Sequence, residues 1–139
     1  EVIVFNSPVS WRSLPNEKVF IKRVIGTPGD HVVCCVNGRI TINGVALVEP
    51  YLNHDQPESQ AAQFTFDIVV PPGRLWVEGD NRYNSGDSVA NYQSTNHNII
   101  ASTIPIPSVI GRAFALFWPF GRATWLSVPS TFNDIPPPR

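Results

Sequence analysis

Short apolar runs separated by turn-forming residues dominate the hydrophobic pattern of this chain. No window has the apolar spacing of an amphipathic helix longer than a few turns. Asn37-Gly38 and Asn43-Gly44 each interrupt the pattern with a two-residue hairpin signal. The pattern predicts an all-β fold of about eight strands in a meander or barrel-like arrangement. The expected strands cover residues 2–5, 19–25, 31–36, 39–42, 45–48, 64–70, 74–78, 109–118 and 124–128.

The segments between these strands differ in character. Residues 6–18 form a loop, and we expect Trp11 to anchor it on the core. Residues 79–107 have little periodicity and many turn formers. The proline-rich end predicts a flexible tail over residues 129–139, which leaves residues 1–128 as one compact domain.

Composition and charge exclude several classes of protein. The net charge of -1 argues against nucleic-acid binding, because such proteins carry a basic patch. The sequence has no run of 18 apolar residues that would span a membrane. Cys34 and Cys35 are adjacent in a predicted strand, so we expect them to point to opposite faces and not to form a disulfide. We predict neither a cofactor nor a metal.

Lys22 lies inside an apolar run, whereas the other lysine, Lys18, follows polar turn residues. Burial in such a run disfavours the charged amine and lowers its pKa. An amine that is neutral near pH 7 can act as a general base. The alternative is a lysine that faces solvent on an edge strand.

A polar stretch directly follows the predicted strand at residues 74–78. It reads Glu78-Gly79-Asp80-Asn81-Arg82-Tyr83-Asn84-Ser85-Gly86-Asp87-Ser88. Its density of hydrogen-bonding groups can orient a catalytic side chain. Two alternatives remain, an elaborate surface loop and a calcium site built from Asp80, Asn84 and Asp87. The spacing of an EF-hand is absent.

Together these stretches resemble the bacterial type I signal peptidases, with features of the Gram-positive or actinobacterial branch. The first strand resembles the GDIVVF segment of that family, and Lys22-Arg23-Val24-Ile25-Gly26-Thr27-Pro28-Gly29-Asp30 resembles KRVIGLPGD. The polar stretch resembles GDNRDNSxDSR. Ile42-Asn43-Gly44 with Glu49-Pro50-Tyr51-Leu52, Val70-Pro71-Pro72-Gly73, and Val109-Ile110-Gly111-Arg112-Ala113 also match, in the same order. The fold implied is the signal peptidase/LexA-like complex folded barrel, with a reduced cap at about residues 37–66.

The resemblance implies a role for each matching residue. Lys22 would be the general base of a Ser/Lys dyad, and Ser85 would orient it. Asp87 would pair with Arg23, and the supporting residues of the loop would be Asp80, Asn81, Arg82 and Ser88. Shallow pockets for an Ala-x-Ala signal peptide would be lined by Val4, Val19, Phe20 and Ile21. The peptide would add a strand beside residues 19–22.

The chain departs from the family pattern at the nucleophile. In the family, the catalytic serine and the oxyanion hole come from a segment before the first strand, which here begins at residue 1. We therefore expect this chain alone not to cleave peptides. Ser85 or Ser88 is the alternative nucleophile. Tyr83 and Val89 replace a usual aspartate and arginine, so we expect Arg23 or Arg82 to compensate at Asp87.

The resemblance also implies a location. The enzyme would lie on the extracytoplasmic face of the cell membrane, with a single-pass anchor upstream of residue 1 and preprotein signal peptides as partners. We expect Trp118, Phe120 and Trp125 to contact the lipid interface, and Phe114 and Leu116 to lie in the core. Two other functions remain open, a LexA-type self-cleaving repressor and a non-catalytic β-rich binding module.

Overall fold

The computed structural model describes residues 1–52 and 61–138. Within them the chain is mostly antiparallel β-structure with one α-helix, and no closed barrel is formed. The strands are β1 (Val2–Asn6), β2 (Val19–Gly26), β3 (His31–Val36), β4 (Arg39–Ile42), β5 (Val45–Ala46), β6 (Phe66–Val69), β7 (Arg74–Glu78), β8 (Ile104–Pro105), β9 (Val109–Arg112), β10 (Ala115–Leu116) and β11 (Thr124–Trp125). The helix is α1 (Ser88–Ser94), and short 3-10 turns cover Val9–Trp11, Ile106–Ser108, Phe120–Arg122 and Ser130–Phe132.

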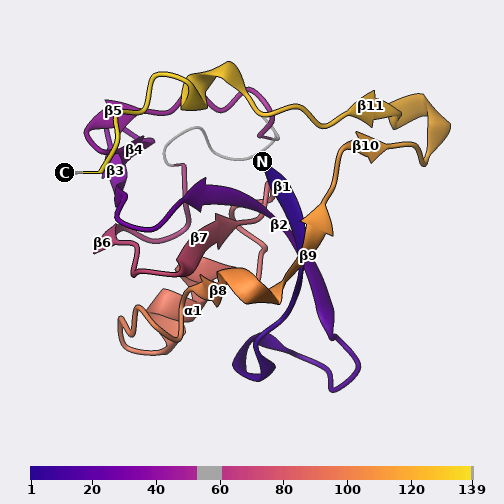
Figure 1. Ribbon diagram of the computed structural model, residues 1–139, viewed down its shortest axis with the longest axis horizontal. Coiled ribbons are helices and arrows are strands. Elements are labelled where there is room, and N and C mark those ends of the chain that lie inside the picture. Colours follow the sequence, from indigo (N-terminus) through magenta and orange to yellow (C-terminus); the bar gives the residue numbers. More distant parts are fainter. Residues whose placement is uncertain (53–60, 139) are drawn as a thin grey trace.

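A five-stranded sheet in the order β8-β7-β2-β1-β9 forms the centre of the molecule (Figure 1). Strand β2 pairs with β1 along residues 19–23 and with β7 from Arg23 onward. One face of this sheet carries a core built around Phe5 and Val77. The predicted anchor Trp11 is confirmed, because it packs edge-on against Phe5 and donates its indole N–H to Ala101 O at 2.8 Å.

A second sheet, in the order β5-β4-β3-β6, packs on the first through a larger core that includes Ile25, Ile40 and Trp76. Its two hairpin turns confirm the sequence signals. Asn37-Gly38 and Asn43-Gly44 all have positive φ, as a type I′ turn requires. Strands β4 and β5 of this sheet fall within the expected cap at residues 37–66, of which residues 53–60 lie outside the described part.

Two features of the fold differ from the sequence-based expectation. Helix α1 occupies a segment without visible periodicity, because Asp87 caps it and its seven residues are too few to repeat an apolar face. The predicted strand at residues 109–118 ends at Arg112, where its pairing with β1 ends. The chain then leaves the body and forms the β10–β11 hairpin, which projects from it in Figure 1.

The prediction for the two cysteines was wrong. Cys34 and Cys35 are joined by a disulfide, and the peptide bond between them is cis. The expectation assumed a trans peptide with alternating side chains. The cis peptide brings the two Cα atoms to 2.9 Å.

The segment at residues 129–138, predicted from composition to be a flexible tail, contacts the second sheet in this structure. Thr131 Oγ1 accepts a hydrogen bond from Val48 N at 2.9 Å, and Pro136 O accepts one from Asn43 Nδ2 at 2.8 Å. Phe132 and Ile135 pack against the larger core. No helix in residues 1–52 and 61–138 combines the length and apolar character needed to cross a membrane.

Candidate active site

Lys22 points from the central sheet toward the polar loop at residues 79–87. In the β1–β2 register, Lys22 lies opposite Ile3 and Phe20 lies opposite Phe5, so both side chains share the core-facing side. Lys22 Nζ donates a hydrogen bond to Ser85 Oγ at 3.0 Å and lies 5.6 Å from the centre of the Phe20 ring. The alternative of a fully solvent-facing lysine is therefore excluded.

Gly79 packs directly against this lysine–serine pair. A Cβ at this position would lie 2.7 Å from Ser85 Cβ and 3.6 Å from Lys22 Nζ, and it would collide with Ser85 Oγ. A side chain at residue 79 would thus push Ser85 away from the amine. The close packing explains why glycine precedes the aspartate of the loop.

Asp87 holds the other end of the loop. One carboxylate oxygen accepts hydrogen bonds from Val89 N and Ala90 N at the start of α1, and the other accepts one from Gly79 N at 2.9 Å. The cap thereby joins the helix N-terminus to the glycine beside the lysine. The Asp87 carboxylate thus binds backbone N–H groups at both ends of the loop.

The predicted pair between Arg23 and Asp87 was wrong. Arg23 instead forms a two-point ion pair with Asp80, with both N···O distances at 2.7 Å. Asp80 follows Gly79 directly, so its carboxylate is within reach of the β2 side chain, whereas Asp87 is turned toward α1. The pair connects the residue after Lys22 with the residue after Gly79.

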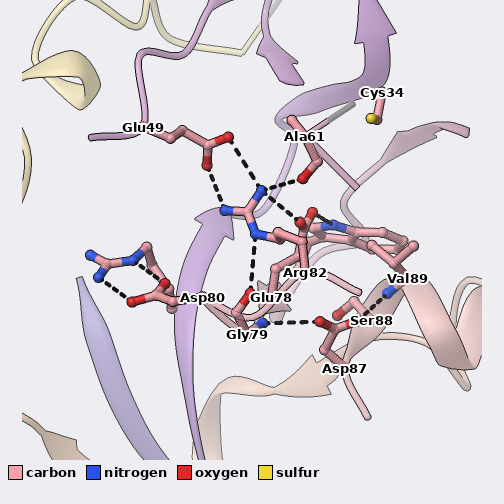
Figure 2. A network of polar contacts seen from close by, with 12 residues as sticks. Cys34, Glu49, Ala61, Glu78, Gly79, Asp80, Arg82, Asp87, Ser88 and Val89 are labelled. Atoms are coloured by element: carbon pink, nitrogen blue, oxygen red, sulfur yellow. Dashed lines mark hydrogen bonds and ion pairs between the residues drawn. The ribbon is translucent and has the colours of Figure 1, made fainter. Parts of the chain in front are cut away.

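Arg82 lies at the centre of a buried polar network (Figure 2). Its guanidinium donates to Glu49 Oε1 at 2.5 Å and to the backbone carbonyls of Gly79 and Ala61 at 3.1 and 2.8 Å. Glu78 Oε2 lies 3.2 Å from Arg82 Nη1, and Glu78 Oε1 accepts the indole N–H of Trp76 at 2.8 Å. Glu49 and Glu78 were not assigned roles from the sequence, although Glu49 stands in a quoted family motif.

Burial sets the electrostatics of this region. Burial lowers the pKa of Lys22, and the carboxylates of Asp87 and Asp80 partly oppose that change. Burial raises the pKa of Glu78 to about 8, against the opposing charge of Arg82. In the described part of the chain, Glu78 Oε2 accepts no hydrogen bond of good geometry. Burial thus disfavours the charged form of both the Lys22 amine and the Glu78 carboxyl group.

The remaining predicted loop residues take different positions. Asn81 is exposed, and its carbonyl accepts the N–H of Asn84 at 3.1 Å. Ser88 is fully buried, and its hydroxyl oxygen accepts Val77 N at 2.9 Å, which argues against the alternative of a Ser88 nucleophile. The oxygens of Asp80 and Asp87 accept from Arg23 and the backbone, which leaves the calcium alternative without a converging set of ligands.

The predicted substrate-lining residues divide between two faces of the sheet. Val4 and Ile21 are direct cross-strand partners on the face opposite Lys22, and Val19 lies on the same face. Ile21 is 56% exposed and Val19 50%. Phe20 lies on the other face, beside Lys22.

The aromatic residues near the end of the chain gather on the projecting hairpin. Trp118, Phe120 and Trp125 are each at least 65% exposed. The expectation that Phe114 and Leu116 lie in the core was wrong, since they are 63% and 42% exposed. They follow the point where the chain leaves the central sheet, so no core is available to them.

Three comparisons agree on the family. The family model for signal peptidase, peptidase S26, matches residues 1–118. A probable signal peptidase I from Mycobacterium leprae is 32% identical over 88% of this chain, and signal peptidase I U from Bacillus subtilis is 34% identical over the same share. This chain covers 56% and 59% of those relatives, so it spans little more than half their length.

A solved structure gives the same result for the fold. The crystal structure of a signal peptidase I from Enterococcus faecalis matches with a TM-score of 0.59 at 28% identity, covering 81% of this chain and 92% of that one. None of these comparisons supports a self-cleaving repressor or a non-catalytic binding module. With the family model matching most of the chain, this protein belongs to the signal peptidase family, peptidase S26.

Proposed function

We propose that the natural protein is a membrane-bound serine endopeptidase that removes N-terminal signal peptides from exported preproteins by a Ser/Lys dyad. The observation that supports this most directly is the half-buried Lys22 amine, 3.0 Å from the Ser85 hydroxyl. Family membership supports the reaction class, and the lowered pKa of Lys22 suits a general base near neutral pH.

In the proposed mechanism, Lys22 takes the proton from a nucleophilic serine supplied by a segment upstream of residue 1. The serine oxygen attacks the carbonyl carbon of the −1 residue, and the protonated Lys22 then gives its proton to the leaving amine. Water hydrolyses the resulting ester with Lys22 again as the base. Ser85 keeps the amine aimed at the serine throughout, while Arg23, Asp80, Asn81, Arg82, Asp87 and Ser88 support the loop.

The signal peptide would bind as an extended strand beside residues 19–22. Within the described residues, β7 pairs with β2 only from Arg23 onward, which leaves this stretch of β2 without β7 as a neighbour. The −1 and −3 side chains of an extended peptide point to the same face. We assign Val4, Val19 and Ile21 to the floor of their shallow pockets, with Phe20 beside the dyad.

The test uses the natural protein, which on this proposal includes a serine-bearing segment before Glu1, and a peptide containing an Ala-x-Ala site. We expect cleavage after the second alanine, a loss of about 10²- to 10⁴-fold on Lys22→Ala, and a smaller loss on Ser85→Ala. Lys18→Ala is the matched control, because Lys18 is exposed. Full cleavage by the Lys22→Ala variant would contradict the dyad. Serine-to-alanine changes upstream of Glu1 identify the nucleophile.

The exposed aromatics of the β10–β11 hairpin support the proposal that the hairpin contacts a lipid surface, which for the proposed function would be the extracytoplasmic face of the membrane. Indole and phenyl rings are favoured at the membrane interface. Two of the four tryptophans, Trp118 and Trp125, lie on the hairpin, whereas Trp11 and Trp76 are buried. Vesicles containing brominated lipids should therefore quench part of the fluorescence, and replacing both hairpin tryptophans with serine should remove the quenching. Quenching that survives this change would place the contact elsewhere.

A further inference from the structure

The segment that follows β5 contacts both arginines that flank the lysine–serine pair. Tyr51 packs its ring on the guanidinium of Arg23, with 3.7 Å between the guanidinium carbon and the ring centre. The Tyr51 hydroxyl donates to Glu49 Oε1 at 2.7 Å, and both oxygens of Glu49 accept hydrogen bonds from Arg82. A continuous series of contacts thus runs from Arg23 through Tyr51 and Glu49 to Arg82.

The two ends of this series meet at Gly79. Arg23 binds Asp80, the residue after Gly79, and Arg82 Nε donates to the carbonyl of Gly79 itself. Gly79 in turn packs against Ser85 and Lys22. A shift of either guanidinium would therefore move Gly79, and with it the distance from the Lys22 amine to the Ser85 hydroxyl.

The contacts between Glu49 and Arg82 are buried. The side chains of Glu49 and Arg82 are only 5% and 4% exposed. Loss of the Glu49 carboxylate would leave Arg82 with Glu78 as its remaining acidic partner among the described contacts, and Glu78 does not reach it with a well-directed hydrogen bond. Arg82 would then have to move or admit water, because an unpaired buried charge is costly.

Building on the proposed function, we propose that Glu49 and Tyr51 are positioning residues of the dyad, which hold Arg82 and Arg23 and thereby fix Gly79 against the Lys22–Ser85 pair. Residues 49–51, which follow β5, thus contribute to the catalytic geometry, although neither Glu49 nor Tyr51 touches the reacting atoms. Glu49 supplies the charge and Tyr51 supplies the ring that covers Arg23.

The chain offers a direct readout that does not depend on catalysis. Its 139 residues contain two lysines, so the Cε signals of a chain labelled with [¹³C]lysine report on Lys22 and Lys18 separately. Burial lowers the pKa of Lys22. If Glu49→Ala or Tyr51→Leu opens the site to water, the pKa of Lys22 should rise, and the Lys22 titration midpoint should move to higher pH. The Lys18 signal should not respond to either change.

The conservative variants separate the two functions of the pair. Tyr51→Phe keeps the ring on Arg23 and Glu49→Gln keeps an acceptor for Arg82, so both should shift the Lys22 midpoint less than Tyr51→Leu and Glu49→Ala. They also keep the proposal testable where the larger truncations fail to fold. Ile40→Val, a fully buried substitution in β4, is the control for lost stability alone and should leave the midpoint in place.

In the natural protein, we expect Glu49→Ala to lower kcat/KM by about 10²-fold, mainly through kcat. The acid limb of the pH profile should move to higher pH, because a base with a higher pKa loses its proton only at higher pH. A Lys22 midpoint that is the same in Glu49→Ala, Tyr51→Leu and Ile40→Val would overturn the proposal. If the midpoint shifts while the natural protein cleaves no signal peptide, the positioning role stands and the proposed function fails.

Discussion

Arg82 and Glu78 are 7% and 0% exposed, whereas Phe120 and Trp125 expose 76% and 77% of their surface. The loop that contains Arg82 thus buries charge, and the β10–β11 hairpin exposes aromatic rings. Both arrangements run against the ordinary distribution, in which charged residues lie outside and large apolar residues inside. A fold tolerates each only where something compensates for it, which is an internal partner in the loop and, as proposed, a lipid surface at the hairpin.

The two regions should therefore respond differently to mutation. In the loop, the partners lie within this chain, so a lost contact should lower the stability of the fold and also disturb the geometry of the Lys22–Ser85 pair. On the hairpin, the proposed partner lies outside the chain, so a lost side chain should affect membrane association alone. The following substitutions test this contrast.

The largest effect is expected at Arg82. Arg82→Ala leaves the buried Glu49 carboxylate without its cation and the buried Glu78 carboxyl group without its neighbouring guanidinium, which should lower the free energy of unfolding by about 3–5 kcal/mol. Arg122→Ala on the hairpin is the matched arginine control, because Arg122 is exposed, and it should change stability by less than about 0.5 kcal/mol. Urea unfolding measures both. Equal losses of stability in the two variants would contradict the expected difference between the loop and the hairpin.

The next effect concerns geometry more than stability. Gly79→Ala places a methyl group against Ser85 and should break the hydrogen bond from Lys22. We expect signal-peptide cleavage by the natural protein to fall by about 10²-fold. Gly86→Ala is the control from the same loop, because a Cβ there meets nothing within 4 Å. Comparable activity in the two variants would show that Ser85 can move without loss of cleavage activity.

Glu78 should make stability depend on pH. Its pKa is raised from 4.5 to about 8, so between these values the folded protein binds a proton that the unfolded chain has released. The free energy of unfolding should therefore fall as pH rises through this window and level off above pH 8. Glu78→Gln removes this titration and should flatten the decline, which for one such group is about 1.4 kcal/mol per pH unit within the window. Urea midpoints at several pH values in both proteins measure it, and parallel curves would exclude Glu78 as the source.

Local signals in the sequence predicted the features that depend on a few neighbouring residues. Asn37-Gly38 and Asn43-Gly44 identify their turns because few other residue pairs accept positive φ at two successive positions. The apolar run around Lys22 and the polar loop were recognisable, and their resemblance to one family brought them together. Helix α1 was missed because its stability depends on the Asp87 cap rather than on an apolar repeat.

The features that sequence reasoning missed depend on how far side chains reach in the folded state. Both Asp80 and Asp87 follow Gly79 closely in sequence, and the backbone turn alone decides which of them meets Arg23. The link through Tyr51 joins residues that are 28 positions apart in sequence, from Arg23 to Tyr51, which no local pattern reports. Likewise, the apolar character of Phe114 indicated a core, but the strand that would have buried it ends at Arg112.

The smallest change in stability is expected on the hairpin. Phe120 and Trp125 are mostly exposed, so Phe120→Ser and Trp125→Ser should each change the free energy of unfolding by less than about 0.5 kcal/mol. The same substitutions should weaken vesicle binding, measured by co-sedimentation, since each removes an apolar ring from the proposed lipid contact. A stability loss above about 1 kcal/mol with unchanged vesicle binding would mean that the rings stabilise the hairpin itself. The exposed aromatics would then belong with the buried charges of the loop, as groups whose partners lie within the chain.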